Sequence, residues 1–249
     1  MTVLRSLAFN VLALAWTVAV MVAWAPLLAG PRRWTAAGMR VWAAGIEALL
    51  AGVVGLRYEV RGRENLPRGG GMVASNHQSA WETVMFARFL DAPAFILKRE
   101  LLRLPTGWYA WRAGSIPINR GGGAGTLRVM VAAAERALRR GQTIVIFPQG
   151  TRIAPGVRRR FRPGIAALYG RLGVPVVPIA LNSGLYWSRR AFLKRPGTVL
   201  VEVLPPIPPG LDRTAFMARL TETIEVALDR LTAEATERIL EQNVNGRSS

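Results

Sequence analysis

The only histidine in the chain, His77, lies five residues before an acidic residue, Glu82. Inside one regular helix, five steps of about 100° would leave the two side chains roughly 140° apart, so they could not touch. If His77 instead lies in a turn ahead of a helix that carries Glu82, the imidazole can fold back over the carboxylate. Such a carboxylate would fix the tautomer of the ring and favour its charged form. The spacing therefore favours a general base for a substrate hydroxyl, although a lone histidine is by default structural.

The residues that would accompany a covalent mechanism are missing from the sequence. It holds no cysteine and no G-x-S-x-G motif, so no recognisable nucleophile accompanies the histidine. Direct attack by a substrate hydroxyl is favoured over a covalent intermediate. One histidine and no cysteine also exclude a zinc site built from those side chains, and the few acidic residues are scattered, so no metal is expected.

A later apolar run ends in the sequence Gln149-Gly150-Thr151-Arg152. A strand that ends in such a turn presents backbone N–H groups, a hydroxyl and a guanidinium together, and this combination suits an anion. A plain strand-end turn with a solvated arginine explains the same residues. Arg120 similarly follows an apolar run directly.

Positive charge is concentrated in the middle of the chain. The formal net charge is +18, and residues 58–209 hold 23 basic against 7 acidic side chains. Arginine accounts for all the basic residues except Lys98 and Lys194. Such a surface attracts phosphate groups, anionic lipids or an acidic carrier, and the arginines of 158–162 fit a phosphate contact, a docking surface or a solvated loop. Nucleic-acid binding is not favoured, because no nucleic-acid-binding module is recognisable.

The N-terminal region is apolar enough to meet a membrane. Between Arg5 and Arg32 lie 26 residues without a charge, and a helix over 5–25 would be about 30 Å long, the thickness of a bilayer core. A second apolar stretch, 41–56, carries Glu47 near its middle and is too short to span comfortably. We therefore expect residues 1–56 to form two helices that embed in or lie on one leaflet. A single span, a cleaved signal peptide and a buried helical hairpin are the alternatives. Four tryptophans of the type that settles at a membrane interface lie here: Trp16, Trp24, Trp34 and Trp42.

After residue 56, short β-rich runs alternate with helical ones, which is typical of an α/β fold. Several runs are continuously apolar, as expected for strands covered on both faces. We predict a mostly parallel mixed sheet flanked by helices. The expected organisation is a two-helix membrane-binding motif over 1–56, an α/β domain over 57–242 and a flexible tail over 243–249. The expected strands are 57–60, 72–75, 94–97, 115–118, 143–147, 174–180 and 199–204, and the expected helices are 80–90, 125–140, 163–172 and one that begins at Asp212.

Four segments of the chain occur in the order found in one enzyme family. They are Asn76-His77 with Glu82, Gly114 through Arg120, Phe147 through Arg152, and Val174 through Asn182. Together with the two N-terminal helices, they resemble the glycerolipid acyltransferase family, in particular the bacterial 1-acyl-sn-glycerol-3-phosphate acyltransferases. The resemblance covers residues 76–182 and implies a glycerol-3-phosphate acyltransferase-like fold.

The resemblance also implies a role for each candidate residue. His77 would be the general base on the free hydroxyl of a lysophospholipid, and Glu82 its orienting acid. The family needs no metal or bound cofactor, because the acyl thioester is a second substrate. The residues implied around the glycerol phosphate are Lys98, Arg120, Gln149, Gly150, Thr151 and Arg152.

Two residues depart from the family's usual pattern. The acid after the histidine is commonly Asp, and Glu82 adds one methylene that the backbone must accommodate. The third segment commonly reads F-P-E-G-T-R, whereas this chain has Gln149. Loss of that carboxylate leaves the pocket one charge more positive. The amide still offers hydrogen bonds, so Gln149 is expected to position other groups and not to catalyse.

The resemblance predicts an enzyme that moves a fatty acyl group to the 2-hydroxyl of a 1-acyl-glycerol-3-phosphate, producing phosphatidic acid. The donor would be acyl carrier protein or coenzyme A carrying the acyl group. The enzyme would work among membrane phospholipids at the cytoplasmic membrane, with its catalytic domain facing the cytoplasm. Two alternatives stay open: the same fold acting on another lysolipid such as lyso-ornithine lipid, or a non-catalytic protein that binds anionic lipids.

Overall fold

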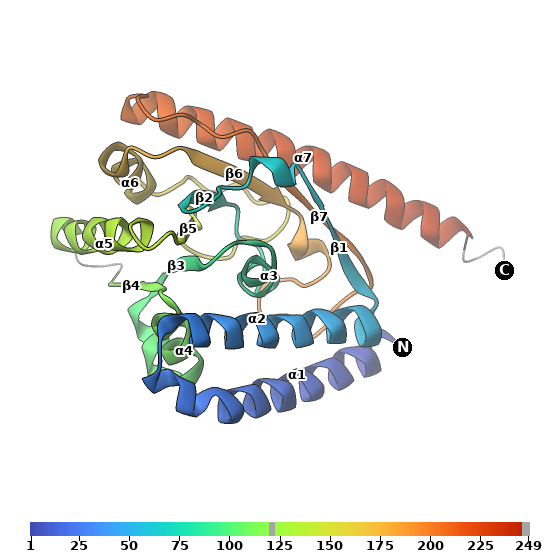
Figure 1. The fold of residues 1–249 in the computed structure, drawn as a ribbon. Helices are drawn as coiled ribbons and strands as arrows, with labels where there is room; N and C mark the ends of the chain where they lie inside the picture. The colour runs from blue at the N-terminus through green and yellow to red at the C-terminus, as the bar shows by residue number, and fades with distance from the viewer. Residues whose placement is uncertain (120–122, 246–249) are drawn as a thin grey trace.

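The computed structural model describes residues 1–119 and 123–245, and it shows a β-sheet with helices on both faces (Figure 1). The sheet joins seven strands in the order β1-β7-β6-β2-β5-β3-β4. β7 pairs antiparallel with β6, and the other neighbouring pairs are parallel. The predicted mixed, mostly parallel sheet is therefore confirmed. The strands are β1 (Leu56–Arg61), β2 (Gly71–Ser75), β3 (Pro93–Lys98), β4 (Ile116–Ile118), β5 (Thr143–Ile146), β6 (Val176–Leu181) and β7 (Gly197–Val203).

The central strands β2, β5 and β6 are buried along their whole length. Their side chains alternate between two cores: along β5, Val145 faces one core while Ile144 and Ile146 face the other. Because both faces are covered, every position is apolar or small, and this explains the continuous apolar runs in the sequence. The carboxyl ends of these parallel strands meet at one edge, where loops can bring their side chains together.

Helices from opposite ends of the chain cover the two faces of the sheet. The core on one face contains residues of α3 (Trp81–Phe89) and of the N-terminal helices. The other core contains residues of α5 (Gly123–Leu138), α6 (Gly164–Leu172) and α7 (Arg213–Asn245). Asp212 caps α7 as predicted, because its Oδ1 accepts the Thr214 and Ala215 N–H groups at 2.7 and 2.9 Å.

The N-terminal motif consists of α1 (Thr2–Trp24), a 3-10 turn η1 (Ala25–Ala29), α2 (Arg32–Leu49) and a π-helical turn η2 (Leu50–Val54). Both helices are long and apolar enough to cross a membrane by length and composition. α1 packs against α2, which in turn packs against α3 and α4 (Pro105–Ala113), so that α1 forms the outer layer (Figure 1). The Arg88–Glu47 salt bridge, with 2.7 Å between Nε and Oε2, ties α3 to α2.

Glycines on α2 make room for the tryptophans of α1. Gly38 and Gly45 are seven residues apart and share one helix face. A Cβ on Gly38 would lie 2.2 Å from Cδ1 of Trp24, and one on Gly45 would lie 2.1 Å from Cε2 of Trp16. The two helices therefore approach closely over these side chains.

This packing changes the expectation that all four N-terminal tryptophans meet a membrane interface. The Trp16 indole N–H donates to the Trp42 carbonyl at 2.9 Å, and that of Trp42 donates to Thr17 Oγ1 at 3.0 Å. Trp24 packs on α2, and only Trp34 among the four is exposed. Three of the tryptophans thus join the helices to each other, because the polar N–H of an indole needs a partner when it is buried.

The structure also adds elements that the sequence pattern did not predict. α4 and the 3-10 turn η4 (Arg99–Arg103) lie between β3 and β4. α7 continues to Asn245, so residues 243–245 of the expected tail are helical, while 246–249 lie outside the described residues. Arg120, one of the expected head-group contacts, also lies outside them.

Candidate active site

His77 and Glu82 come together at the carboxyl edge of the sheet. His77 lies in the turn after β2, and Glu82 is the second residue of α3. The distance between His77 Nδ1 and Glu82 Oε1 is 2.8 Å. The contact that the five-residue spacing predicted is therefore present.

The Glu82 carboxylate is fully buried and held by several donors. Its Oε1 accepts the N–H groups of Gln78 and Ser79 at 2.6 and 2.7 Å. Its Oε2 accepts the Ser183 hydroxyl at 2.7 Å. A buried carboxylate without partners would carry a large desolvation cost, and these donors offset it. Consequently Glu82 has a fixed orientation towards the imidazole.

The hydrogen bond to Glu82 determines which nitrogen of His77 can accept a proton. Because the carboxylate is an acceptor, we assign the proton of the neutral ring to Nδ1, which leaves a lone pair on Nε2. The ring stacks on Phe147, with 4.1 Å between centroids and 16° between planes. The His77 side chain is 13% exposed and lines a cleft, so a ligand there can reach the ring.

Gln149 holds the backbone of His77 from behind the cleft. Its Oε1 accepts the His77 N–H at 2.7 Å, and the His77 carbonyl accepts the Ile153 N–H at 2.7 Å. Both backbone polar groups of His77 are thus tied to the turn that follows β5. This contact requires only an acceptor oxygen, and an amide supplies one as well as a carboxylate does.

The cleft that contains His77 has a volume of about 660 Å³ and combines cationic with apolar walls. Its polar side comes from the turn after β5, the end of β3 and the loop after β6. Its apolar side comes from α1, α2 and α4. A ligand with an anionic group and a long apolar group would find a complementary wall for each. The charged and polar lining residues are Thr17, His77, Thr83, Lys98, Thr106, Tyr109, Ser115, Thr151, Arg152, Arg189 and Arg190.

Arg152 supplies the positive charge of the predicted anion-binding turn, and its side chain is partly buried. Burial lowers the pKa of its guanidinium, while Glu82 raises this pKa and Arg189 lowers it, each to a smaller extent. An arginine stays charged at neutral pH despite such a shift. Because Arg152 has lost part of its hydration, an anionic ligand would recover more energy there than at a fully solvated arginine.

Gly150 gives this turn its shape. Its φ of +73° lies in the left-handed region, which glycine adopts without strain. A Cβ at this position would lie 2.5 Å from Nε of Arg162. Glycine therefore lets the backbone turn sharply beside Arg162 without strain.

A protein-family model described as Acyltransferase matches residues 57–182, which are just over half of the chain. The chain belongs to this acyltransferase family. A 1-acyl-sn-glycerol-3-phosphate acyltransferase from Pseudomonas aeruginosa is 37% identical over 183 residues, covering 73% of this chain and 71% of that protein. A lyso-ornithine lipid O-acyltransferase from the same species is 30% identical, covering 70% and 73%. The crystal structure of a 1-acyl-sn-glycerophosphate acyltransferase from Thermotoga maritima shares the fold, with a TM-score of 0.75, 18% identity, and coverage of 94% of this chain and 100% of that one.

In this acyltransferase, most of the site residues expected from the sequence come together. His77, Lys98, Gly150, Thr151 and Arg152 all line the same cleft. Glu82 and Gln149 are buried behind it and hold the histidine. Their roles in binding and catalysis stay predictions.

Sequence reasoning missed four residues of the acyltransferase site. Ser183 fixes Glu82, Phe147 supports the imidazole ring, and Arg189 and Arg190 line the cleft. Ser183 directly follows the fourth sequence segment, and a polar residue at the carboxyl end of a strand was a signal that could have revealed it. Nothing in the sequence around the two arginines distinguishes them from the other basic residues of the chain.

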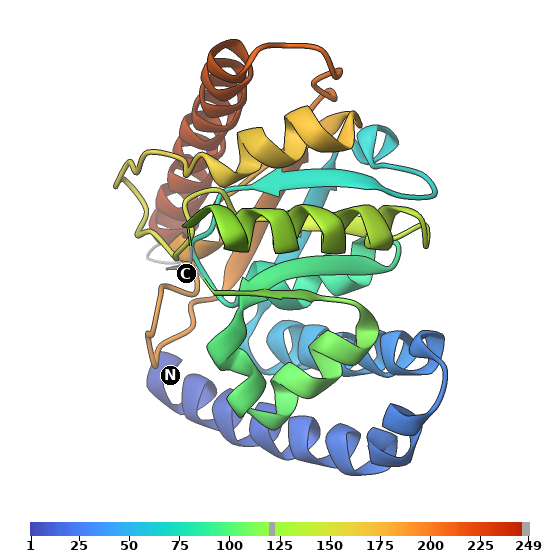
Figure 2. The same ribbon diagram turned by 90° about the vertical axis from the view of Figure 1, so that its left-hand side faces the viewer.

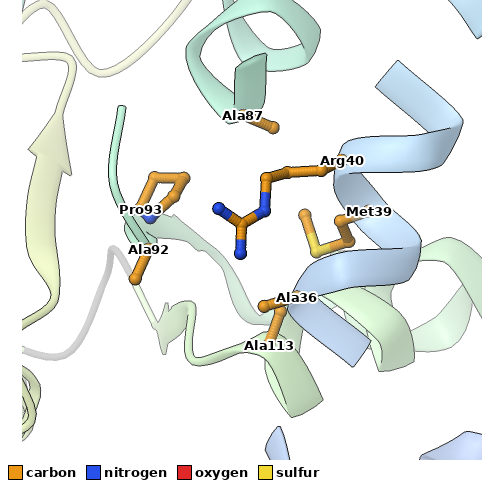
Figure 3. Close-up of a pocket in the computed structure, with 7 residues that line it drawn as sticks. All are labelled: Ala36, Met39, Arg40, Ala87, Ala92, Pro93 and Ala113. Carbon is orange, nitrogen blue, oxygen red and sulfur yellow. The ribbon is translucent and has the colours of Figure 1, made fainter. Parts of the chain in front are cut away.

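Other parts of the acyltransferase offer weaker candidates for a site. A gap of about 10 Å³ between α2, α3 and the start of β3 is at the lower limit for one water molecule. Its lining is mostly small side chains, and Arg40 extends across it from α2 towards Ala92 and Pro93 (Figure 3). The gap therefore reflects packing. Among the described residues, no group of three or more His, Asp or Glu side chains is placed to hold a metal ion.

Proposed function

We propose that this acyltransferase moves a fatty acyl group from a thioester to the 2-hydroxyl of 1-acyl-sn-glycerol-3-phosphate, producing phosphatidic acid. The observation that carries the proposal is the His77–Glu82 pair, which opens onto a cleft with both cationic and apolar walls. The relative from Pseudomonas aeruginosa with that acceptor in its name supports it.

The geometry suggests how the transfer proceeds. Nε2 of His77 takes the proton of the acceptor hydroxyl while the hydroxyl oxygen attacks the carbonyl carbon of the thioester. The resulting imidazolium is stabilised by the buried Glu82 carboxylate. When the tetrahedral intermediate collapses, the carbon–sulfur bond breaks and the imidazolium returns its proton to the leaving thiolate. The products are an ester and a free thiol, and His77 regains its neutral form.

The two sides of the cleft supply the binding. We place the acceptor phosphate against Lys98, Thr151 and Arg152, where cations and a hydroxyl face the ligand. We also assign Arg120 to the acceptor phosphate, and this assignment rests on the sequence alone. Acyl chains would lie along the apolar walls from α1, α2 and α4, because these walls remove hydrocarbon from water.

The proposal includes the partners and the location of the enzyme. Acyl carrier protein or coenzyme A would deliver the acyl group, and phospholipids would contact the exposed side of the N-terminal helices. Two N-terminal helices that are long and apolar enough to cross a membrane support a membrane location. We place it on the cytoplasmic membrane with the catalytic domain facing the cytoplasm, because acyl thioesters are intracellular donors.

A second acceptor has one specific observation in its favour. The lyso-ornithine lipid O-acyltransferase from Pseudomonas aeruginosa aligns with 70% of this chain at 30% identity. A human 1-acyl-sn-glycerol-3-phosphate acyltransferase aligns with the same share at 33% identity. An ornithine head group has no phosphate. It does carry a carboxylate, but with a smaller negative charge than a phosphate monoester, so replacement of Arg152 by Gln should raise the KM more for the phosphate-bearing acceptor.

One assay tests the proposal directly. Purified full-length protein receives lysophosphatidate or lyso-ornithine lipid together with acyl-coenzyme A or acyl carrier protein loaded with an acyl thioester, and mass spectrometry identifies the product. We expect phosphatidic acid from the wild-type protein and nearly none from a His77→Ala variant that still folds. Acylation of lyso-ornithine lipid alone would select the second acceptor. Absence of any product with all four combinations would leave only a lipid-binding protein.

A further inference from the structure

The outer face of α1 is one of three exposed apolar surfaces on the same side of the molecule. Only 6% of its most apolar 18-residue window is buried inside the protein. An apolar surface of this size on a folded protein marks a contact with a membrane or another protein. The exposed large apolar side chains of α1 are Val3, Leu4, Leu7, Val11, Leu12, Leu14, Val18 and Val22.

The second exposed surface belongs to η4 and α4, and hydrogen bonds tie α4 to the C-terminal end of α1 and to the residues that follow it. The Tyr109 hydroxyl donates to the Met21 carbonyl, and Arg112 donates to the carbonyls of Leu28 and Gly30 at 2.7 and 2.6 Å. These hydrogen bonds fix α4 beside α1. The exposed apolar side chains of this surface are Leu101, Leu104, Trp108 and Trp111.

The third exposed surface lies at the N-terminal end of α1. There the loop between β6 and β7, drawn in orange, reaches down to the start of the chain (Figure 2). The Lys194 backbone N–H donates to Ser6 Oγ at 2.9 Å, and its ammonium donates to Asn10 Oδ1 at 2.5 Å. Beside this contact, Phe192 and Leu193 expose their side chains.

We propose that these three surfaces form one bilayer-binding rim, defined as the exposed apolar side chains of α1, of η4–α4 and of Phe192–Leu193. The inference rests on the proposed function only in that the acceptor is a membrane lipid. Contact with the bilayer thus extends past the two N-terminal helices to two segments of the catalytic domain. Each segment is tied to one end of α1, so the rim is fixed as a unit and α1 lies along the bilayer surface.

The charges around the rim favour an anionic bilayer over a second copy of the chain. Arg99, Arg103 and Arg195 are exposed next to its apolar side chains and can meet lipid phosphates. A symmetric dimer through the same surface would bring the arginines of both copies into one interface. With a net charge of +18 on each chain, such an interface would be repulsive.

The rim also frames the mouth of the catalytic cleft. Met21 of α1 and Gly107 and Tyr109 of α4 line the cleft, and the same two helices carry rim residues on their exposed sides. The acyl chains of a bound lysolipid would then lie on the inner side of the helices whose outer side meets the leaflet.

The absence of cysteine from the chain allows a direct test with single labels. Trp111→Cys and Phe192→Cys probe the two new segments, and Val11→Cys probes α1. Val129→Cys and Val226→Cys are matched controls on α5 and α7, because these valines are 62% and 64% exposed, against 53% for Trp111 and 49% for Phe192. Each full-length variant carries an environment-sensitive fluorophore and is mixed with phosphatidylcholine–phosphatidylglycerol vesicles that contain a nitroxide-labelled lipid.

We expect the lipid nitroxide to quench the labels at 111 and 192 as strongly as the label at 11, and to leave the labels at 129 and 226 unquenched. Labels at 111 and 192 that behave like those at 129 and 226 would overturn the proposal and restrict the bilayer contact to α1. A blue-shifted but unquenched label at 111 would place that surface against another protein and would overturn it as well.

A charge-insertion pair gives a second measurement. Trp111→Asp with Phe192→Asp should lower the vesicle partition coefficient about tenfold or more, because two apolar side chains can no longer insert. Val129→Asp with Val226→Asp adds the same charge elsewhere and should change it less than about twofold. Acyl transfer in detergent micelles, measured on both variants, distinguishes loss of bilayer binding from loss of enzymatic activity. The variant with substitutions at 111 and 192 should stay active in micelles. Equal partitioning of the two variants would contradict the proposal.

Discussion

At the scale of single residues, the side chain of Glu82 makes four hydrogen bonds. Oε1 meets His77 and two backbone N–H groups, and Oε2 meets Ser183. The extra methylene relative to Asp lets a carboxylate on the first turn of α3 face back into the turn that holds His77. The departure from the family's usual Asp is therefore accommodated by the local backbone.

Replacement of Glu82 by Gln should lower kcat about 100-fold or more with little change in KM. The amide lacks the negative charge that would stabilise the imidazolium. Its NH2 group would also lie against the N–H or O–H groups that donate to the Glu82 carboxylate. Glu82→Asp keeps the charge and should retain more activity than Glu82→Gln. Steady-state kinetics in mixed micelles measures both variants, and equal rates for Glu82→Gln and wild type would remove the orienting acid from the mechanism.

Gln149 should tolerate a change of charge better than a loss of its acceptor. Gln149→Glu preserves an oxygen for the His77 N–H and should keep kcat within about tenfold of wild type. Gln149→Leu leaves that buried N–H without a partner and should lower kcat further, while the KM changes less. The two variants are close in size, so a larger loss in Gln149→Glu would show that charge, and not the hydrogen bond, matters at this position.

The sequence could predict those parts of the site that lie close together along the chain. His77 and Glu82 are five residues apart, so the geometry of a turn and a helix was enough to expect their contact. Ser183 is 101 residues from Glu82, and only the pairing of β2 with β6 brings it there. The backbone contact of Gln149 was equally out of reach, because it depends on the adjacency of β2 and β5.

At the scale of elements, the loop between β6 and β7 connects Glu82 to α1. At its start Ser183 holds Glu82, and further on the ring of Trp187 contacts Phe9 with 5.6 Å between centroids. Near its end the Lys194 ammonium lies among the rings of Phe9, Trp187 and Phe192 at 5.2 to 5.9 Å. Cation–π contacts offset part of the cost of burying this charge.

The buried Lys194 predicts a pH dependence of stability. Burial lowers its pKa in the folded protein, whereas the unfolded lysine titrates near about 10.4. Below the folded pKa the ammonium is charged in both states, and its burial cost is fully present. As the pH rises through the folded pKa towards about 10.4, the unfolded chain binds more protons, so the free energy of unfolding should rise.

A Lys194→Met variant lacks this titration, and comparison with it cancels the other groups. The difference in unfolding free energy between wild type and variant should therefore shift in favour of wild type from pH 7.5 to 10. Denaturant titrations in detergent at several pH values measure this difference. A difference that stays constant with pH would mean that Lys194 has an ordinary pKa in the folded state.

Strands and helices were predictable where burial dictates composition. The central strands are covered on both faces, so their apolar runs locate them within about two residues. α4 was not predicted, because it is only nine residues long, begins at Pro105 and contains Gly107, and proline and glycine are typical of loops. The strand order could not be read either, since it depends on which apolar faces pack together in space.

At the scale of the whole molecule, the placement of positive charge should matter more than its total. The rim carries arginines beside its apolar side chains, while other arginines lie on the far layer of helices. Binding to vesicles should strengthen as the fraction of anionic lipid rises, and most of this gain should be lost above about 0.5 M salt, where the Debye length falls below about 5 Å. Vesicle sedimentation across a salt series measures it.

Two triple variants with the same net charge separate local from global attraction. The first variant removes three charges at the rim by Arg99→Gln, Arg103→Gln and Arg195→Gln. It should weaken binding to anionic vesicles about tenfold or more, since each basic residue near the surface contributes about 1 kcal/mol. The control changes three exposed arginines of α5, α6 and α7 to Gln. It should weaken binding much less, because these helices cover the other face of the sheet and screening by salt reduces attraction over a longer distance. Equal losses in both variants would mean that the net charge alone draws the protein to the membrane. The control positions are Arg128, Arg171 and Arg219.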